Sequence, residues 1–313
     1  MKFTLVIPVA PERGAEIIES IKKLDYPKSE FHVVVVRGLN PSENRNKGSD
    51  RGLGKYIVFL DDDAKIESDY LLRIEDFFNR HPEIEIVGGP QLTPDDDKGF
   101  AKISGYALSS LFGAYKLASR YSCSEEDCDV DETSLTSANL ICRKDVMDKV
   151  RFDPSLFPGE DPKFISDAKK QGYKVAYDPK IRIFHRRRAD SRGMLKQFFN
   201  YGKVRPAKES FFETLKMPFF FVPSLFTIYL VLLIISILIR PTITGNVVGN
   251  VSSIWFWWFV PIVIYILLMM VFSIHDSIKN KDFKAFPLLL PIYPMIHLSY
   301  GIGMIWGYFK KLK

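Results

Sequence analysis

The segment Met217–Ile239 constrains the fold more than any other part of the chain, because none of its 23 residues is charged. As a helix it would be about 35 Å long, enough to cross the hydrocarbon core of a bilayer. A second apolar segment, Ile254–Ile274, has five consecutive aromatic residues near its start, as is typical of the membrane–water boundary. A third segment, 286–309, has three prolines in its first half, so it could span the membrane or bend back within it. We therefore predict two or three transmembrane helices, at about 217–239, 254–274 and 286–309.

The distribution of charge separates this region from the rest of the chain. Residues 217–313 carry seven basic and two acidic side chains, whereas residues 1–216 carry 36 basic and 35 acidic ones. The connection 241–253 is uncharged, and three lysines follow the second apolar segment within 279–284. By the positive-inside rule the connection lies outside and the N-terminal domain lies in the cytoplasm, which predicts a multi-pass protein of the cell membrane. Basic residues do not interleave with aromatic ones in a stripe, so nucleic acid is not an expected partner.

The N-terminal domain has the pattern of an α/β fold. Short β-branched runs at 3–9, 31–36 and 56–60 predict strands, and a helical stretch at 14–24 separates the first two. Continuous apolar strands that alternate with helices indicate a mainly parallel, Rossmann-like sheet covered on both faces. Ligands bind such sheets at the carboxyl ends of the strands. We expect this domain to cover 1–210 and the membrane domain to cover 211–313.

Three adjacent carboxylates, Asp61, Asp62 and Asp63, follow the third predicted strand directly. Their mutual repulsion is relieved by a bound cation. Mg²⁺ and Mn²⁺ prefer oxygen ligands, which one or two carboxylates and a phosphate group often supply together. The triplet therefore predicts a metal site that binds a diphosphate. The alternative is a solvated acidic turn that caps the next helix, expected at about 69–80. For the second triplet, Asp95–Asp97, no comparable strand precedes it, and a solvated loop is favoured.

The second half of the domain supplies another polar set. Glu160 and Asp161 follow a Pro-Gly turn and begin a predicted helix that runs to about Lys170. Carboxylates at the start of a helix often serve only as caps, which is the alternative for this pair. Strands are predicted at 173–177 and 181–184. His185 and three arginines, 186–188, come directly after the second of these strands and could bind a metal or phosphate oxygens. Three basic residues before the first apolar segment could instead bind anionic lipid headgroups, namely Lys203, Arg205 and Lys208.

The cysteines match neither a zinc pattern nor a disulfide framework. Cys123 and Cys128 are five positions apart with no histidine nearby in the sequence, and Cys142 leaves an odd number. A disulfide between the first two is the alternative, but the expected compartment is reducing.

Several motifs, taken in order, resemble those of the family 2 glycosyltransferases of GT-A fold. They are IPVAPER at 7–13, NRNKG at 44–48, YIVFLDDD at 56–63, TSANLICRKDV at 136–146, FDPSLFPGED at 152–161, GYKVAYDP at 172–179, His185 and QFFNYGKVR at 197–205. The stretch HLSYGIGMIWGY at 297–308 is similar to the tail of members that make exopolysaccharide or lipid-linked glycans, such as the succinoglycan-type transferases.

The resemblance implies an inverting transfer of a sugar from a nucleoside diphosphate sugar to a lipid-linked or membrane-proximal glycan acceptor. It implies a divalent metal, Mg²⁺ or Mn²⁺, on Asp63 and His185, and a general base at Asp161. Asp61 and Asp62 would face the nucleoside. The remaining residues expected to bind the nucleotide sugar are Pro8, Ala10, Glu12, Asn46, Glu160, Arg186, Gln197 and Arg205.

Two departures from the family pattern bear on specificity. Arg37 and Gly38 stand where the family usually has an aspartate that reads the base. A full QxxRW motif, which processive members carry, is missing, so a single addition is expected. The alternatives are a polyprenyl-phosphate sugar synthase and a non-catalytic scaffold that binds nucleotide sugars.

Overall fold

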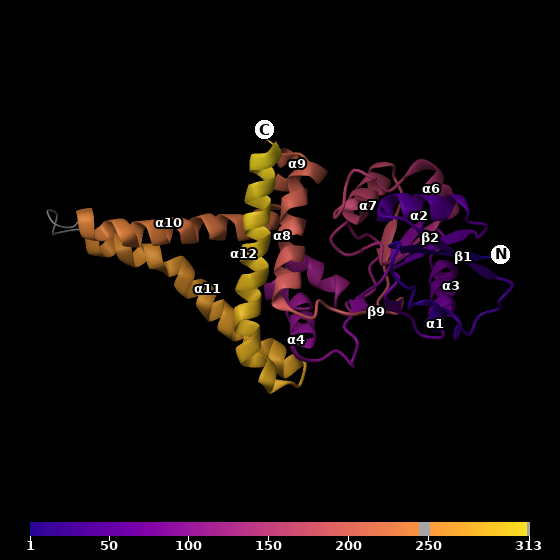
Figure 1. The fold of residues 1–313 in the computed structure, drawn as a ribbon, viewed down its shortest axis with the longest axis horizontal. Coiled ribbons are helices and arrows are strands. Elements are labelled where there is room, and N and C mark those ends of the chain that lie inside the picture. The colour runs from indigo at the N-terminus through magenta and orange to yellow at the C-terminus, as the bar shows by residue number, and fades with distance from the viewer. Residues whose placement is uncertain (244–250, 312–313) are drawn as a thin grey trace. The chain divides into compact units, whose positions relative to one another are not determined.

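The computed structural model describes residues 1–243 and 251–311, which form two compact units, Met1–Arg188 and Ala189–Lys313. Figure 1 shows strands and helices in the first unit, whereas the described part of the second unit is helical. An α/β region followed by apolar helices is confirmed. The division after Arg188 groups residues 189–210 with the helices, whereas the sequence suggests a first domain of 1–210.

The first unit is built on a six-stranded sheet with the strand order β2-β1-β3-β7-β5-β8. Its strands are β1 (Phe3–Val9), β2 (Phe31–Arg37), β3 (Tyr56–Leu60), β5 (Ile86–Gly88), β7 (Asn139–Arg143) and β8 (Val175–Tyr177). β1 is parallel to both β2 and β3, whereas β7 is antiparallel to its neighbours β3 and β5. The carboxyl ends of β1, β2 and β3 therefore share one edge of the sheet, where the sequence predicts a ligand site.

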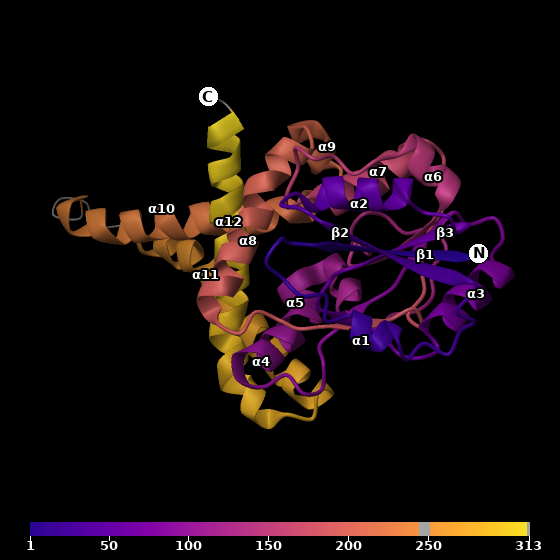
Figure 2. The same cartoon turned by 45° about the vertical axis from the view of Figure 1, so that its right-hand side comes forward.

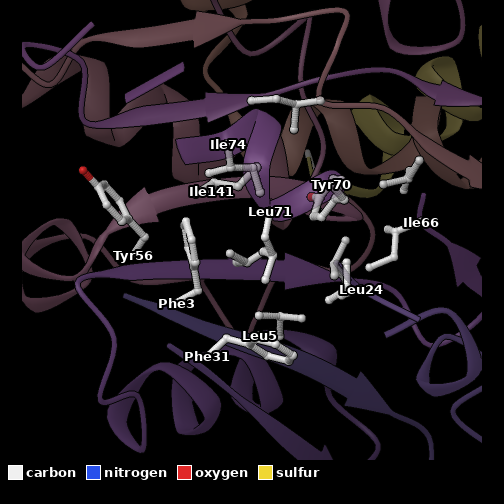
Figure 3. Close-up of a cluster of buried hydrophobic side chains, with 14 of the residues drawn as sticks. Phe3, Leu5, Leu24, Phe31, Tyr56, Ile66, Tyr70, Leu71, Ile74 and Ile141 are labelled. Carbon is white, nitrogen blue, oxygen red and sulfur yellow. The ribbon is translucent and has the colours of Figure 1, made fainter. Parts of the chain in front are cut away.

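Both faces of the sheet are covered. Successive side chains of a strand point to opposite faces, so one buried strand contributes to two core clusters. Phe3 and Leu5 of β1 join a core cluster with α3 (Tyr70–Arg80), whereas Val6 joins a second cluster with α6 (Lys144–Lys149) and α7 (Glu160–Lys170). Figure 3 shows Leu71 and Ile74 of α3 beside the strand residues of the first cluster. This double covering explains why the strands have continuous apolar sequences.

The predicted helix over 14–24 is mostly turns, and α1 covers only Ile18–Ile21. The backbone N–H of Ile17 donates to the carbonyl of Asp62 at 3.1 Å, which ties this segment to the end of β3. The other helices of the unit are α2 (Pro41–Asp50), α4 (Gly99–Leu108), α5 (Leu111–Ala114) and η1 (Tyr115–Arg120). A small second sheet has the strand order β4 (Ala64–Lys65), β9 (Ile183–His185) and β6 (Gln91–Leu92). The strands predicted at 173–177 and 181–184 are present but shorter or shifted.

The second unit contains three helices long and apolar enough to cross a membrane. The candidate spans are Pro218–Ile239, Phe256–Lys279 and Phe283–Lys311. They belong to α10 (Val222–Ile243) with the preceding η2 (Pro218–Phe221), to α11 (Val251–Lys279), and to α12 (Phe286–Lys311) with the preceding η3 (Phe283–Ala285). The third apolar segment is thus one helix despite its prolines. Residues 244–250 of the connection predicted to lie outside the cell are not among the described residues.

Glycines bring α12 close to α8 (Ser191–Lys208), the helix that precedes the short α9 (Phe211–Leu215). A Cβ on Gly202 would lie 2.1 Å from the carbonyl oxygen of Tyr300, and one on Gly303 would lie 2.1 Å from that of Phe199. Figures 1 and 2 both show α8 running alongside α12. The glycines of the stretch 297–308 therefore have a packing reason, because only glycine permits so close an approach of two backbones.

Candidate active site

The first acidic triplet lies at the carboxyl end of β3, where two arginines from other elements reach it. Arg13, in the turn after β1, places its Nη2 atom 2.8 Å from Asp63 Oδ2 and 3.3 Å from Asp62 Oδ1. Arg45 of α2 places its Nη2 atom 3.1 Å from Asp61 Oδ1. Each carboxylate of the triplet thus has a guanidinium partner, so the triplet is an organised site and not a solvated turn.

His185 joins the same triplet from the end of β9. Its Nε2 atom lies 3.0 Å from Asp63 Oδ1 and 3.9 Å from Asp61 Oδ2. The pairing of β4 with β9 places Ala64 opposite His185, which brings the residue after the triplet and the imidazole together. One ligand atom from each of Asp61, Asp63 and His185 lies within 4.8 Å of the other two. Such an oxygen-rich donor set fits Mg²⁺ or Mn²⁺.

Adjacent aspartates of the triplet have opposite pKa shifts. Burial raises the pKa of Asp62 to about 6, against the attraction of Arg13. Burial alone would raise the pKa of Asp63 too, but the hydrogen bond from His185 and the guanidinium of Arg13 hold it well below its usual range. Asp63 is therefore firmly ionised, as a metal ligand must be.

The second acidic pair begins α7. Glu160 is almost fully buried and its Oε1 atom lies 3.0 Å from Arg45 Nη1. Burial and the neighbouring Asp161 raise the pKa of Glu160, and Arg45 opposes that shift. Burial alone would lower the pKa of the Arg45 guanidinium, but Asp61, Asp161 and Glu160 raise it above its usual value. Arg45 is thus a permanent cation between the triplet and the pair.

Asp161 has a partner of a different kind. Its Oδ1 atom accepts a hydrogen bond of 2.7 Å from the hydroxyl of Ser137, which lies two residues before β7. Ser137 is itself buried. The hydrogen bond orients the Asp161 carboxylate beside the buried Glu160–Arg45 ion pair, so a carboxylate, a cation and a candidate metal site meet in one region.

A family model, described as Glycosyl transferase family group 2, matches residues 56–273, more than half of the chain. The chain belongs to this glycosyltransferase family. The match includes both acidic motifs, His185, the first apolar helix and most of the second. No curated protein sequence matches the chain.

Solved structures in complex with nucleotide sugars are similar to this chain at low sequence identity. The structure of S. aureus TarS 1-349 in complex with UDP-GlcNAc has a TM-score of 0.46 and 17% identity, over 66% of each chain. The mannosyltransferase PcManGT from Pyrobaculum calidifontis, in complex with GDP-Man and Mn²⁺, has a TM-score of 0.46 and 14% identity, over 67% of this chain and 65% of that one. Against the longer S. aureus TarS structure the alignment spans only 40% of that chain. The assignment to the glycosyltransferase family rests on the family model.

The structure places the other predicted nucleotide residues of this glycosyltransferase in varied surroundings. Pro8 is buried within β1, and Ala10 and Glu12 are exposed in the turn that follows it. The side-chain amide of Asn46 donates to the carbonyl of Phe152 at 2.8 Å and accepts from its N–H at 3.1 Å. Both ends of this amide are thus engaged with the backbone, which gives Asn46 a structural role.

Arg186 pairs with the second acidic triplet. Its Nη1 and Nη2 atoms lie 2.8 Å from Asp97 Oδ1 and 2.6 Å from Asp96 Oδ2. Asp97 is buried, so the prediction of a fully solvated loop at Asp95–Asp97 is wrong for that residue. Its burial is tolerated because the Arg186 guanidinium and the backbone N–H of Arg187 bind its carboxylate.

Gln197 and Arg205 belong to α8, in the second unit. Gln197 donates to the hydroxyl of Tyr201 at 2.9 Å. Arg205 is buried, pairs with Glu209 at 2.8 Å and lies over the ring of Phe220 at 3.6 Å. Lys208 is buried beside the same glutamate. Burial of Arg205 and Lys208 argues against the alternative that they bind lipid headgroups.

Sequence reasoning missed three site residues: Arg13, Arg45 and Ser137. Arg13 and Arg45 both lie inside quoted motifs, at 7–13 and 44–48. Three adjacent carboxylates at a strand end, of which Asp62 is buried, need cations, and these two arginines follow β1 and β2, whose ends lie at the same sheet edge. This need for cations could have identified Arg13 and Arg45 from the sequence. Ser137 carried no comparable signal.

Proposed function

We propose that this glycosyltransferase transfers one sugar, with inversion, from a nucleoside diphosphate sugar to a lipid-linked or membrane-proximal glycan acceptor. The observation that carries the proposal is the position of Arg45, whose guanidinium binds both Asp61 and Glu160. It joins the triplet suited to a metal and diphosphate with the helix that presents Asp161. A donor and an acceptor could therefore meet in one site.

The donor side consists of the triplet, His185 and the turn after β1. Asp63 and His185, joined by Asp61 because the geometry brings the three side chains together, would hold Mg²⁺ or Mn²⁺. The ion when bound would neutralise charge on the departing diphosphate. The ionised state of Asp63 supports this role. Ala10 and Glu12 are exposed directly after β1, where the family resemblance expects the nucleobase. Asp62, whose pKa is raised, would face the nucleoside.

The acceptor side consists of Asp161 and the groups that hold it. Ser137 donates to Asp161, which fixes the orientation of the carboxylate. An acceptor hydroxyl bound by Asp161 would lose its proton to this carboxylate as its oxygen attacks the anomeric carbon. Attack from the face opposite the diphosphate inverts the configuration at that carbon. The Arg45–Glu160 ion pair keeps the start of α7 in place during this step.

The apolar helices indicate an acceptor at the membrane. Three helices could span by length and composition, and lysines follow the second one. These features support a cell-membrane location with the catalytic unit in the cytoplasm. The missing QxxRW motif supports a single addition over processive synthesis.

The test uses the full chain purified in detergent, with release of nucleoside diphosphate as the readout. Donors are varied, beginning with UDP-GlcNAc and GDP-Man, each with Mn²⁺ or Mg²⁺ and with or without a polyprenol-linked lipid extract. We expect one donor to be used, and its turnover to rise with the lipid. Asp161→Asn should abolish transfer but keep nucleotide binding.

The matched control is Asp167→Asn on the same helix, where the carboxylate pairs with Lys163. It should retain transfer. If Asp161→Asn kept most of the wild-type rate, Asp161 would not be the base, and an acceptor that needs no base, such as a polyprenyl phosphate, would be indicated. If no donor were turned over in any condition, the proposed reaction would be rejected.

A further inference from the structure

A second cluster of metal-ligand side chains lies in the first unit and shares no residue with the candidate active site. It comprises His81, directly after α3, Glu83 two residues later, and Glu126 and Cys128 in the segment between η1 and β7. One ligand atom from each of His81, Glu126 and Cys128 lies within 4.8 Å of the other two. The fold thus brings an imidazole next to a thiol 47 positions away in the sequence.

The two nitrogens of His81 face different partners. Nδ1 lies 3.7 Å from Cys128 Sγ and 3.8 Å from Glu83 Oε1. Nε2 lies 2.8 Å from Glu126 Oε1 and 3.1 Å from Arg80 Nη1. An N–H at Nε2 that donates to Glu126 leaves the lone pair of Nδ1 facing the thiol and the second carboxylate. Metal-binding histidines usually have this arrangement, with a carboxylate holding the nitrogen that does not bind the metal.

The distances around Nδ1 suit a tetrahedral zinc ion. Zinc lies about 2.3 Å from a thiolate and about 2.0–2.1 Å from an imidazole nitrogen, so tetrahedral ligands are separated by about 3.6 Å for N and S and about 3.4 Å for N and O. The observed separations of 3.7 Å and 3.8 Å are close to these values. A mixed set of thiolate, imidazole and carboxylate ligands favours zinc over Mg²⁺ or Ca²⁺.

The charges around the cluster favour a cation. Arg80 is the adjacent basic residue, and its guanidinium is bound by three carboxylates, at 2.8 Å from Glu126, 3.0 Å from Asp76 and 3.2 Å from Asp178. Glu83 adds a fourth carboxylate at His81 Nδ1, and a second guanidinium, that of Arg143, donates to the carbonyl of Pro82 between these two residues. Four carboxylates thus lie near two guanidinium groups. The local excess of negative charge would be reduced by a divalent ion.

We propose that His81, Glu83 and Cys128 bind a zinc ion, with Glu126 as the residue that orients His81. The ion would join the end of α3 to the segment 121–138. That segment has little regular structure, apart from an isolated bridge between Asp127 and Tyr177, and it leads to Ser137, the partner of Asp161. Zinc would hold this long connection in place.

The test is cobalt binding by the full chain in detergent, after removal of metals with a chelator. Co²⁺ bound to a thiolate gives a charge-transfer absorption band in the near ultraviolet, whereas Co²⁺ at Asp61, Asp63 and His185 has no thiolate ligand. We expect one such band, which Zn²⁺ abolishes. Cys128→Ser and His81→Ala should lose it, and Glu126→Gln should weaken cobalt binding by about 10–100-fold.

The matched control is Cys123→Ser, because Cys123 is an exposed free thiol five positions away. This variant and Asp63→Asn should both keep the band. A second measurement needs no substitution: Zn²⁺ should slow maleimide labelling of Cys128 in the wild-type chain but not that of Cys123. The proposal is overturned if the wild type shows no band, if Cys128→Ser keeps the band, or if Zn²⁺ leaves the labelling of Cys128 unchanged.

Discussion

The triplets Asp61–Asp63 and Asp95–Asp97 have the same sequence but very different surroundings. The first follows a buried strand and receives Arg13, Arg45 and His185 from three separate elements. In the second, one arginine, Arg186, binds two of the three carboxylates. The comparison shows that position at a sheet edge, and not the acidic residues themselves, determines how many partners converge on a triplet.

The largest expected effect comes from removing the buried cation of the first triplet. Arg45→Met would leave Asp61 and Glu160 without their shared partner, and breaking a buried ion pair costs about 3–5 kcal/mol. Hydrogen–deuterium exchange of β3 and α7 in the full chain measures this loss of protection. The control is Arg51→Met, an exposed arginine at the end of the same helix. Equal protection in the two variants would contradict the structural role of Arg45.

The next effect concerns sugar transfer. Asp63→Asn would remove a proposed metal ligand that is firmly ionised. Loss of an outer partner of a metal already costs about 10–100-fold, so we expect transfer to fall by at least about 100-fold. Chelation of the metal should produce the same loss in the wild type and be reversed by Mn²⁺ or Mg²⁺. Transfer that survives both treatments would refute a metal at the first triplet.

The second triplet should affect stability more than transfer. Asp97→Asn would remove a buried, charged acceptor of hydrogen bonds from Arg186 and the Arg187 backbone. Hydrogen bonds to charged groups contribute about 1.5–3 kcal/mol each, so a loss of about 2 kcal/mol is expected in the exchange protection of residues around β6. If transfer fell as far as in Asp63→Asn, both triplets would belong to the active site.

The smallest effect is expected at Asp95. Its side chain is exposed, and surface substitutions away from special features change stability by less than about 0.5 kcal/mol. Asp95→Asn should therefore leave both exchange protection and nucleoside diphosphate release unchanged. A clear change in either quantity would show that the second triplet has a role beyond its contact with Arg186.

Features determined by neighbouring residues were predictable from the sequence. The strands 3–9 and 56–60 are confirmed because their apolar, β-branched residues are contiguous, and a strand end can be located from the same pattern. The helix over 14–24 was wrong for most of its length: α1 covers only Ile18–Ile21, and the Ile17 N–H before it donates to the carbonyl of Asp62. That bond depends on tertiary structure.

Partners distant in the sequence were not predictable in the same way. Ser137 and Asp161 are 24 positions apart, and nothing in the spacing indicates that their side chains meet. The cysteine spacing predicted no zinc site, because His81 approaches Cys128 only after α3 and the segment 121–138 have packed together. The requirement that buried carboxylates have cations could have identified Arg45, but not which carboxylates it would bridge.

The close packing of α8 on α12 limits how much of α12 can contact lipid. Gly202, Gly303 and Gly307 place the two backbones against each other along the second half of α12. Because α8 carries several charged residues, burying it in hydrocarbon would cost several kcal/mol. The covered half of α12 is therefore best accommodated at the headgroup level. Its apolar length therefore overstates the thickness of bilayer that it could cross.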